Sequence, residues 1–271
     1  MRAKGHGSRM RPSPIRRRLL AGLVALCAMV ACSGQPDASR SVTVFAAASL
    51  TRVLPALALA FARTHTDVRI DPVFAGSQIL RMQIEHGAPA DVFLSAHARH
   101  VEDLAAAGRT TRQGPFATNE LVIAVPADAP IADLDDLAFG ATIVMGTEAV
   151  PVGMAARTFL ARLEATEDRG LAEALRRAVV SYEPDVRLVA AKVARKEVDA
   201  GFVYATNVAA DPHLRALPLP DHLRVPTVLH AAIVAGPGAP RPDAASFFDF
   251  LLSDEAAEVL ADYGFGPPPP P

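Results

Sequence analysis

The 271-residue sequence contains no tryptophan, only two cysteines and almost no net charge. Its 27 Lys and Arg residues nearly balance 29 Asp and Glu residues, so no large basic surface favours nucleic acid as a partner. The apolar fraction of 51% is nevertheless sufficient for substantial cores. The chain should therefore fold as a globular protein of one large or two ordinary domains.

Sequence motifs of several enzyme classes are also missing. The chain has no G-x-S-x-G nucleophile elbow, no G-x-x-x-x-G-K-[ST] phosphate loop and no G-x-G-x-x-G after a strand. A serine nucleophile would need an activating base and an oxyanion hole. No catalytic residue is assigned, and a secreted hydrolase is kept as the alternative from a different functional class.

The histidines do not form a recognisable cation site. His97 and His100 are three residues apart next to Arg99, but no carboxylate or thiol pattern accompanies them. They are interpreted as solvated residues of a helix. No metal cation and no cofactor are assigned.

The first 31 residues are predicted to be a signal peptide that is removed. Three arginines at residues 16–18 precede an apolar run over residues 19–31. This run is too short to cross a bilayer core about 30 Å thick as a helix, and its flanks fit a secretory signal. The protein is therefore expected outside the cytoplasm.

Residues 29–32 read Met-Val-Ala-Cys and are similar to a bacterial lipoprotein cleavage box, in which the cysteine becomes the lipidated N-terminus. Acyl chains contribute about 0.8 kcal/mol per buried methylene, so they would hold the protein at a membrane without a spanning helix. Cys32 is the predicted lipidation site. Ordinary cleavage near Ala31, with Cys32 incidental, is the alternative. Because Cys27 lies in the removed segment, no intrachain disulfide remains.

After a polar tether over residues 32–40, strand-like apolar runs alternate with helical stretches, which is typical of an α/β fold with parallel strands. The pattern restarts near residue 121, which indicates two lobes with a cleft between them. Strands are predicted at residues 42–46, 68–73, 92–94, 121–125, 142–145, 200–204 and 228–234. Helices are predicted at residues 50–65, 79–86, 154–164, 171–179, 186–196 and 244–263. The proline-rich residues 267–271 are expected to form an exposed tail.

Five neutral hydrogen-bond donors stand at strand ends and predicted helix starts. Ser49, Ser77 and Tyr204 offer hydroxyls, and Val152 and Val186 offer backbone N–H groups. Helix starts carry unpaired N–H groups and the positive end of the helix dipole, which favour an anion. Neutral donors can satisfy a buried dianion without a salt bridge. The expected ligand is therefore an oxyanion.

Each of these residues also has a purely structural interpretation. A serine before a helix is most often an N-cap, which stabilises the helix by about 1 kcal/mol. Tyr204 would ordinarily be a core aromatic residue with a satisfied hydroxyl. The residue types of Val152 and Val186 carry no signal of their own.

Taken in order, seven segments resemble the periplasmic molybdate-binding proteins, the receptor components of molybdate ABC importers. The segments are VFAAASLT (residues 44–51), FAGSQ (74–78), GAPADVFLSA (87–96), VPVGMAA (150–156), DVR (185–187), GFVYAT (201–206) and YGFG (263–266). The resemblance extends over residues 41–266. A full-length ordered set of this kind is far more specific than any one motif.

The resemblance implies a type II periplasmic-binding-protein fold with two α/β lobes. Lobe 1 would comprise residues 41–119 plus 224–266 and lobe 2 residues 120–223, with hinge crossings near residues 119–120 and 219–225. The ligand-binding positions of the family fall on Ser49, Ser77, Val152, Val186 and Tyr204.

The function implied by the resemblance is capture of molybdate, and of tungstate, by a monomeric receptor that delivers it to an ABC permease and its ATPase subunit. Another oxyanion such as sulfate is the alternative within this class. Two departures from the family pattern stand out. Gln78 follows Ser77 where the family usually has a small hydroxyl residue, and residues 153–185 form a longer stretch than in compact members.

Overall fold

The structure is a computed structural model that describes residues 40–166, 169–236 and 241–270. The predicted signal peptide, the lipidation site Cys32 and the tether up to residue 39 lie outside the described residues. Within the described residues, no helix is long and apolar enough to cross a membrane.

The described residues form a nine-stranded mixed sheet in the order β2-β1-β3-β9-β4-β7-β5-β6, with β8 paired to β4. The strands are β1 (Ser41–Ala47), β2 (Arg69–Ala75), β3 (Val92–Ser95), β4 (Thr110–Pro126), β5 (Ile143–Gly146), β6 (Val179–Glu183), β7 (Ala200–Tyr204), β8 (Leu214–Ala216) and β9 (Pro226–Val234). The helices are α2 (Leu54–Phe61), α3 (Ser77–Glu85), α4 (Ala98–Ala106), α5 (Leu134–Ala138), α6 (Pro151–Ala165), α7 (Arg169–Arg177), α8 (Val186–Ala194), α9 (Ala205–Ala209), α10 (Pro242–Leu251) and α11 (Asp254–Asp262), with short 3₁₀ turns η2 (Ala48–Leu50) and η3 (Asp221–Leu223).

The expected α/β class is confirmed, but the sheet is not parallel throughout. Strand β1 pairs in parallel with β2 and β3, and β5 pairs in parallel with β6 and β7. Strand β4 is antiparallel to β7 and β9, and β9 is antiparallel to β3. These antiparallel strands in the middle join two parallel groups, which we call lobe 1 (around β1, β2 and β3) and lobe 2 (around β5, β6 and β7).

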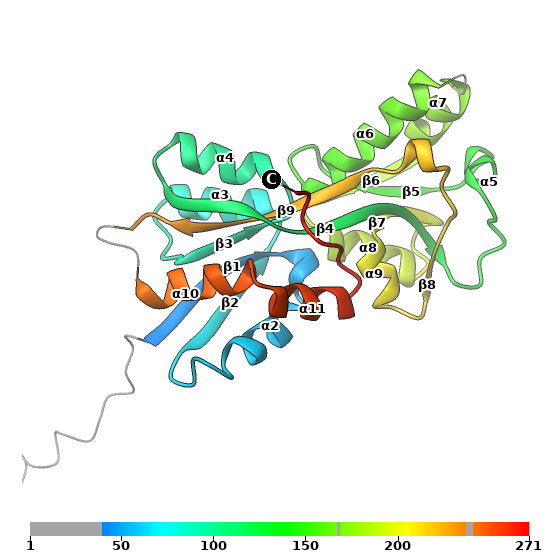
Figure 1. Cartoon of the computed structure of the whole chain (residues 1–271). Coiled ribbons are helices and arrows are strands. Elements are labelled where there is room, and N and C mark those ends of the chain that lie inside the picture. The colour runs from blue at the N-terminus through cyan, green and yellow to red at the C-terminus, as the bar shows by residue number, and fades with distance from the viewer. Residues whose placement is uncertain (1–39, 167–168, 237–240, 271) are drawn as a thin grey trace, which may run out of the picture. The chain divides into compact units, whose positions relative to one another are not determined.

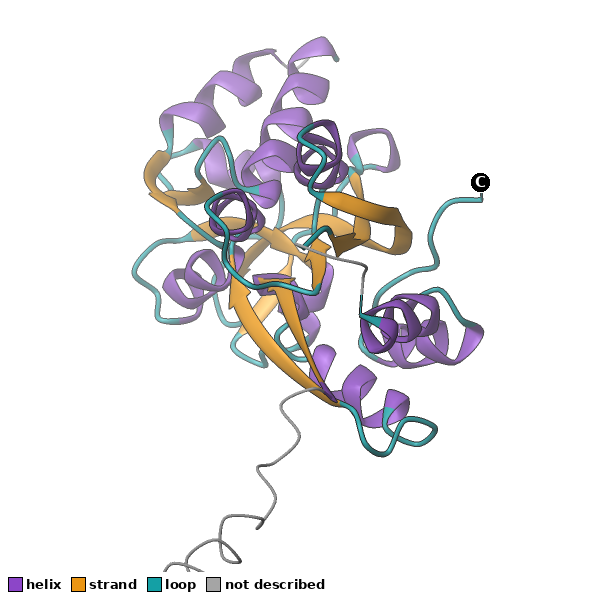
Figure 2. Ribbon diagram, turned by 90° about the vertical axis from the view of Figure 1, so that its left-hand side faces the viewer, coloured by secondary structure: helices purple, strands orange, loops and turns teal. Residues whose placement is uncertain are grey.

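Helices cover both faces of the lobe 1 strands (Figure 1). On one face α2, α10 and α11 build a core around Leu57, Phe61 and Phe247. On the other, α3 and α4 pack Leu80 and Leu104 against the sheet. The strands are covered from both sides, which explains why the apolar run of β1 is almost entirely buried. Figure 2 shows the strands in the centre with helices on both sides.

Lobe 2 has a separate core. Its centre is formed by Phe159 of α6 and Phe202 of β7, whose ring centroids lie 5.6 Å apart. Strand β4 contributes to both lobes, because its first part pairs with β9 and its last part with β7 and β8. The exact lobe boundaries and the hinge positions stay a prediction.

Several element predictions were too long or missed an element. The helix predicted over residues 244–263 is two helices, because α10 ends at Leu251 and Ser253 caps α11 by accepting from the Ala256 N–H. The helix predicted over residues 50–65 is α2 alone, preceded by η2 and with a proline in its first turn. The first half of β4 was not predicted, since it is polar and two register shifts interrupt its alternation. Elements α4, α5, α9, β6 and β8 were also not predicted as such.

His97 and His100 were predicted to be solvated, and this prediction was wrong for His100. His97 is half-buried and caps α4, its Nδ1 accepting from the Arg99 N–H at 3.1 Å. His100 is 4% exposed, and neither ring nitrogen has a hydrogen-bond partner. Burial, together with the positive charge of Arg81, lowers the pKa of His100 to about 4. The residue is therefore a neutral core histidine rather than a solvated one.

We expect His100 to make the protein less stable in mild acid. Its folded-state pKa of about 4 lies below the unfolded value near 6.5, so between these values the unfolded chain holds a proton that the folded chain excludes. Stability contributed by this group is full above pH 6.5 and is lost as the pH falls toward 4. Between pH 7 and 4.5, the wild type should lose about 1–2 kcal/mol more unfolding free energy than His100→Leu.

Denaturant titrations at several pH values measure this difference. His213→Leu is the matched control, because it makes the same substitution at an exposed histidine. Parallel curves for the wild type and His100→Leu would contradict the assignment.

Candidate anion-binding site

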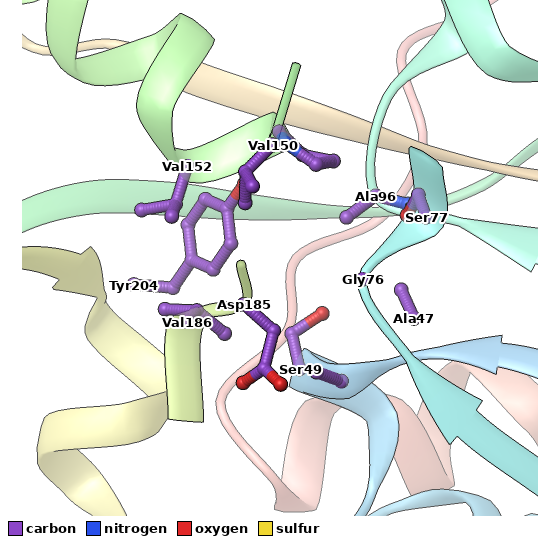
Figure 3. A pocket seen from close by; sticks show the side chains of 12 residues that line it. Ala47, Ser49, Gly76, Ser77, Ala96, Val150, Val152, Asp185, Val186 and Tyr204 are labelled. Atoms are coloured by element: carbon purple, nitrogen blue, oxygen red, sulfur yellow. The ribbon is translucent and has the colours of Figure 1, made fainter. Parts of the chain in front are cut away.

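A small cavity lies between the two lobes, where several strands end. Figure 3 shows Val152, Val186 and Tyr204 on one side of it and Ser77, Gly76 and Ala47 on the other. The cavity is small, with a volume of about 10 Å³, whereas pockets for drug-sized molecules reach about 300 Å³ or more. The lining residues are Ala47, Ala48, Ser49, Gly76, Ser77, Ala96, Val150, Pro151, Val152, Asp185, Val186 and Tyr204.

All five residues expected from the sequence line this one cavity. Each comes from a different chain segment. Ser49 lies in η2 after β1, and Ser77 is the first residue of α3 after β2. Val152 lies in the first turn of α6 after β5, Val186 begins α8, and Tyr204 ends β7. The fold thus brings together five segments that are separated by up to 155 positions in the sequence.

The two serines are not helix caps. The N-cap of η2 is Ala47 and that of α3 is Gly76, and neither helix start has a side-chain cap bond. The Ser49 hydroxyl is buried and has no hydrogen-bond partner. The N-cap interpretation of these serines is therefore wrong, because neither hydroxyl caps its helix.

The Ser77 hydroxyl accepts a backbone hydrogen bond that orients it. Its Oγ accepts from the Ala96 N–H at 3.1 Å, and the side chain is 1% exposed. Because that bond uses a lone pair, the hydroxyl hydrogen remains available to donate. Ser77 is thus prepared to act as a donor toward the cavity.

Tyr204 is buried, as expected of a core aromatic residue, but its hydroxyl is not satisfied. The residue is 1% exposed, and the hydroxyl has no hydrogen-bond partner. Burial raises the pKa of this hydroxyl well above its ordinary value, and the neighbouring Thr227 side chain offsets only part of the increase. The group therefore keeps its proton and can donate at any physiological pH.

The backbone donors stand at two helix starts. Val152 lies in the first turn of the 15-residue α6 and Val186 is the first residue of α8, positions at which an N–H has no intrahelical acceptor. Close packing fixes the first turn of α6 against β5. A Cβ built on Gly153 would lie 2.1 Å from the Thr147 carbonyl oxygen, and one on Gly146 would lie 2.8 Å from the Gly153 nitrogen. Only glycine permits this approach.

Asp185 is a charged lining residue that was not included among the expected ligands. Its carboxylate caps α8, with Oδ1 accepting from the N–H groups of Arg187 and Leu188 at 2.8 and 3.2 Å. The Arg187 guanidinium lies 3.5 Å from Oδ2. The two N–H bonds and the Arg187 contact hold the carboxylate at the start of its own helix. An aspartate directly before a predicted helix start was the sequence signal for it.

The site therefore presents hydroxyl and N–H donors, with no cationic side chain among its lining residues. Within the described residues, no group of three or more His, Cys, Asp or Glu is arranged to hold a metal ion. Such an arrangement can enclose a small, fully deprotonated anion by hydrogen bonds.

Comparison with known proteins agrees with this geometry. A family model described as bacterial extracellular solute-binding protein matches residues 42–266. The molybdate-binding protein of Haemophilus influenzae is 32% identical over 243 residues, which is 84% of this chain and 91% of that protein. A Bacillus subtilis protein, named provisionally as an ABC transporter substrate-binding lipoprotein, is 30% identical over 261 residues, covering 91% of this chain and 96% of its own.

Solved structures support the fold. The periplasmic molybdate-binding protein of Azotobacter vinelandii superimposes with a TM-score of 0.70 at 22% identity, covering 84% of this chain and 100% of that one. A sulfate-binding protein of Mycobacterium tuberculosis gives a TM-score of 0.73 at 18% identity, covering 84% and 87%. The expected type II periplasmic-binding-protein fold is thereby confirmed.

These similarities cover nearly the whole of the described chain, from β1 to the residues after α11. Members of the matched family bind solutes and are not enzymes, so the hydrolase alternative is set aside. The curated relatives of the chain are mostly molybdate-binding proteins. The chain belongs to the family of bacterial extracellular solute-binding proteins, as an extracytoplasmic substrate-binding component of an ABC transporter.

Proposed function

We propose that the protein captures molybdate, and tungstate with it, for import by an ABC transporter. The observation that carries this proposal is the enclosure of one small cavity by five neutral donors from both lobes: Ser49, Ser77, Val152, Val186 and Tyr204. The relatedness to molybdate-binding proteins supports the choice of ligand.

In this proposal the anion holds the two lobes together. Ser49 and Ser77 donate from lobe 1, while Val152, Val186 and Tyr204 donate from lobe 2. A ligand that bridges donors of both lobes stabilises the closed state over the open one. The closed state is then what the membrane permease recognises.

The donor set favours fully deprotonated oxyanions. Ser77 already accepts a bond from Ala96, and Tyr204 holds its proton firmly, so both hydroxyls act toward the ligand as donors. A protonated anion would carry a hydrogen that needs an acceptor. Molybdate, tungstate and sulfate present only acceptors at neutral pH.

Sulfate is the second candidate, because the fold is shared with a sulfate-binding protein. The two anions have the same charge and differ in size, so donor distances and cavity radius must select between them. We expect calorimetry to give tight, stoichiometric binding of molybdate and tungstate and little binding of sulfate. Equal affinities for sulfate and molybdate would overturn the proposed ligand.

Removing one donor should weaken binding measurably. We expect Ser77→Ala to raise the molybdate dissociation constant about 10- to 150-fold, because it leaves a buried anion short of one hydrogen bond. The same titration with Thr51→Ala is the control, since the Thr51 hydroxyl bonds to the Ala48 carbonyl and does not line the cavity. An unchanged constant in Ser77→Ala would remove Ser77 from the site.

The membrane anchor at Cys32 is proposed separately, with support from the lipoprotein name of the Bacillus subtilis relative. Lipidation there would keep the receptor beside its permease. Cys32→Ser should shift the protein from the detergent phase to the aqueous phase in Triton X-114 partitioning. If wild type and variant partition alike, Cys32 is not the anchor.

A further inference from the structure

A side-chain hydrogen bond joins the two lobes beside the cavity. Gln78, the second residue of α3 in lobe 1, donates from Nε2 to the Pro184 carbonyl oxygen at 2.8 Å. Pro184 lies just before α8 in lobe 2, 106 positions away in the sequence. Asn119 and Thr206 form another side-chain bond at the crossing strand β4, whereas the Gln78–Pro184 contact lies next to the lining residues Gly76 and Asp185.

The contact depends on a glycine. A Cβ built on Gly76 would lie 2.5 Å from the Pro184 carbonyl oxygen and 2.6 Å from both terminal atoms of the Gln78 amide. The amide and the carbonyl therefore both lie against the bare α-carbon of Gly76. Any larger residue there would push the lobes apart or displace the amide.

The Gln78 amide is also partly enclosed. Its Oε1 is buried and has no hydrogen-bond partner, although the residue as a whole is half-buried. A buried acceptor without a partner costs free energy, so another interaction of the amide must offset the cost of burying Oε1. The bond to Pro184 is that interaction, because only the N–H end of an amide can donate to a carbonyl.

The two partners are adjacent to ligand donors. Gln78 directly follows Ser77, and Pro184 precedes Val186 by two residues. The bond thus connects the start of α3 to the start of α8, two helix starts that contribute proposed donors from opposite lobes. A serine at position 78 has a side chain two bonds shorter and would not span the same gap.

We propose that Gln78 is a positioning residue whose bond to Pro184 holds the lobes closed over the bound anion and slows its release. We call this bond the latch. This inference rests on the proposed function. The bond forms only when the lobes meet and opposes their opening, so it acts on the release rate and not on the association rate.

Stopped-flow kinetics test the latch. The chain contains no tryptophan, so the fluorescence of its three tyrosines, including Tyr204 in the cavity, reports binding without a tryptophan background. The observed rate plotted against molybdate concentration gives the association rate from the slope and the release rate from the intercept. Gln78→Met keeps the length of the side chain and removes the donor.

We expect Gln78→Met and Gln78→Ser to release molybdate about 3- to 10-fold faster than the wild type, with association rates within about 2-fold. Gln83→Met is the matched control on the same helix, because Gln83 is exposed and its side chain makes no hydrogen bond with the described residues. Thermal unfolding of each variant verifies that it is folded. Release rates equal to the wild type in both Gln78 variants, or a change confined to association, would overturn the latch while leaving the proposed function intact.

A failure of the proposed function is distinguishable. If the wild type binds neither molybdate nor tungstate, small-angle scattering without added anion tests whether the Gln78–Pro184 bond holds the lobes together. The latch predicts a larger radius of gyration for Gln78→Met and Gly76→Ala than for the wild type and Gln83→Met. Equal radii would then contradict it.

Discussion

Under the proposed function, the removal of a dianion from water is the constraint on which the rest of this structure depends. A doubly charged ion enclosed in protein is stable only when donors replace its hydration on all sides. Here those donors are neutral hydroxyl and N–H groups, contributed by Ser49, Ser77 and Tyr204 and by two helix starts. In the proposed function the donors come from both lobes, so binding of the anion and closure of the lobes are coupled.

The mixed sheet makes this possible. Parallel strands in each lobe place their carboxyl ends, and the helix starts that follow them, on the same edge. Close approaches at Gly76, Gly146 and Gly153 then bring backbone to backbone around the cavity without intervening side chains. Strand β4 links the lobes, because it pairs with β9 on one side and with β7 on the other.

Much of this arrangement was predictable from the sequence. Strand β7 has the predicted bounds, and the five expected donor positions line one cavity because each follows a strand with a clear apolar pattern. Polar sequence prevented prediction elsewhere: the first half of β4 pairs with β9, but register shifts interrupt its alternation. The burial of His100 and the contact between Gln78 and Pro184 depend on tertiary packing of distant segments, which local pattern does not encode.

The central claim is that one oxyanion binds in the cavity lined by the five neutral donors. A crystal of the protein grown with tungstate, measured at the tungsten absorption edge, tests it most directly, because the anomalous signal locates the metal atom independently of any model. The account predicts one strong peak between the lobes, with ligand oxygens within hydrogen-bond distance of the Ser49, Ser77 and Tyr204 hydroxyls and the Val152 and Val186 N–H groups. A peak outside this cavity, or one coordinated by carboxylates, would contradict it.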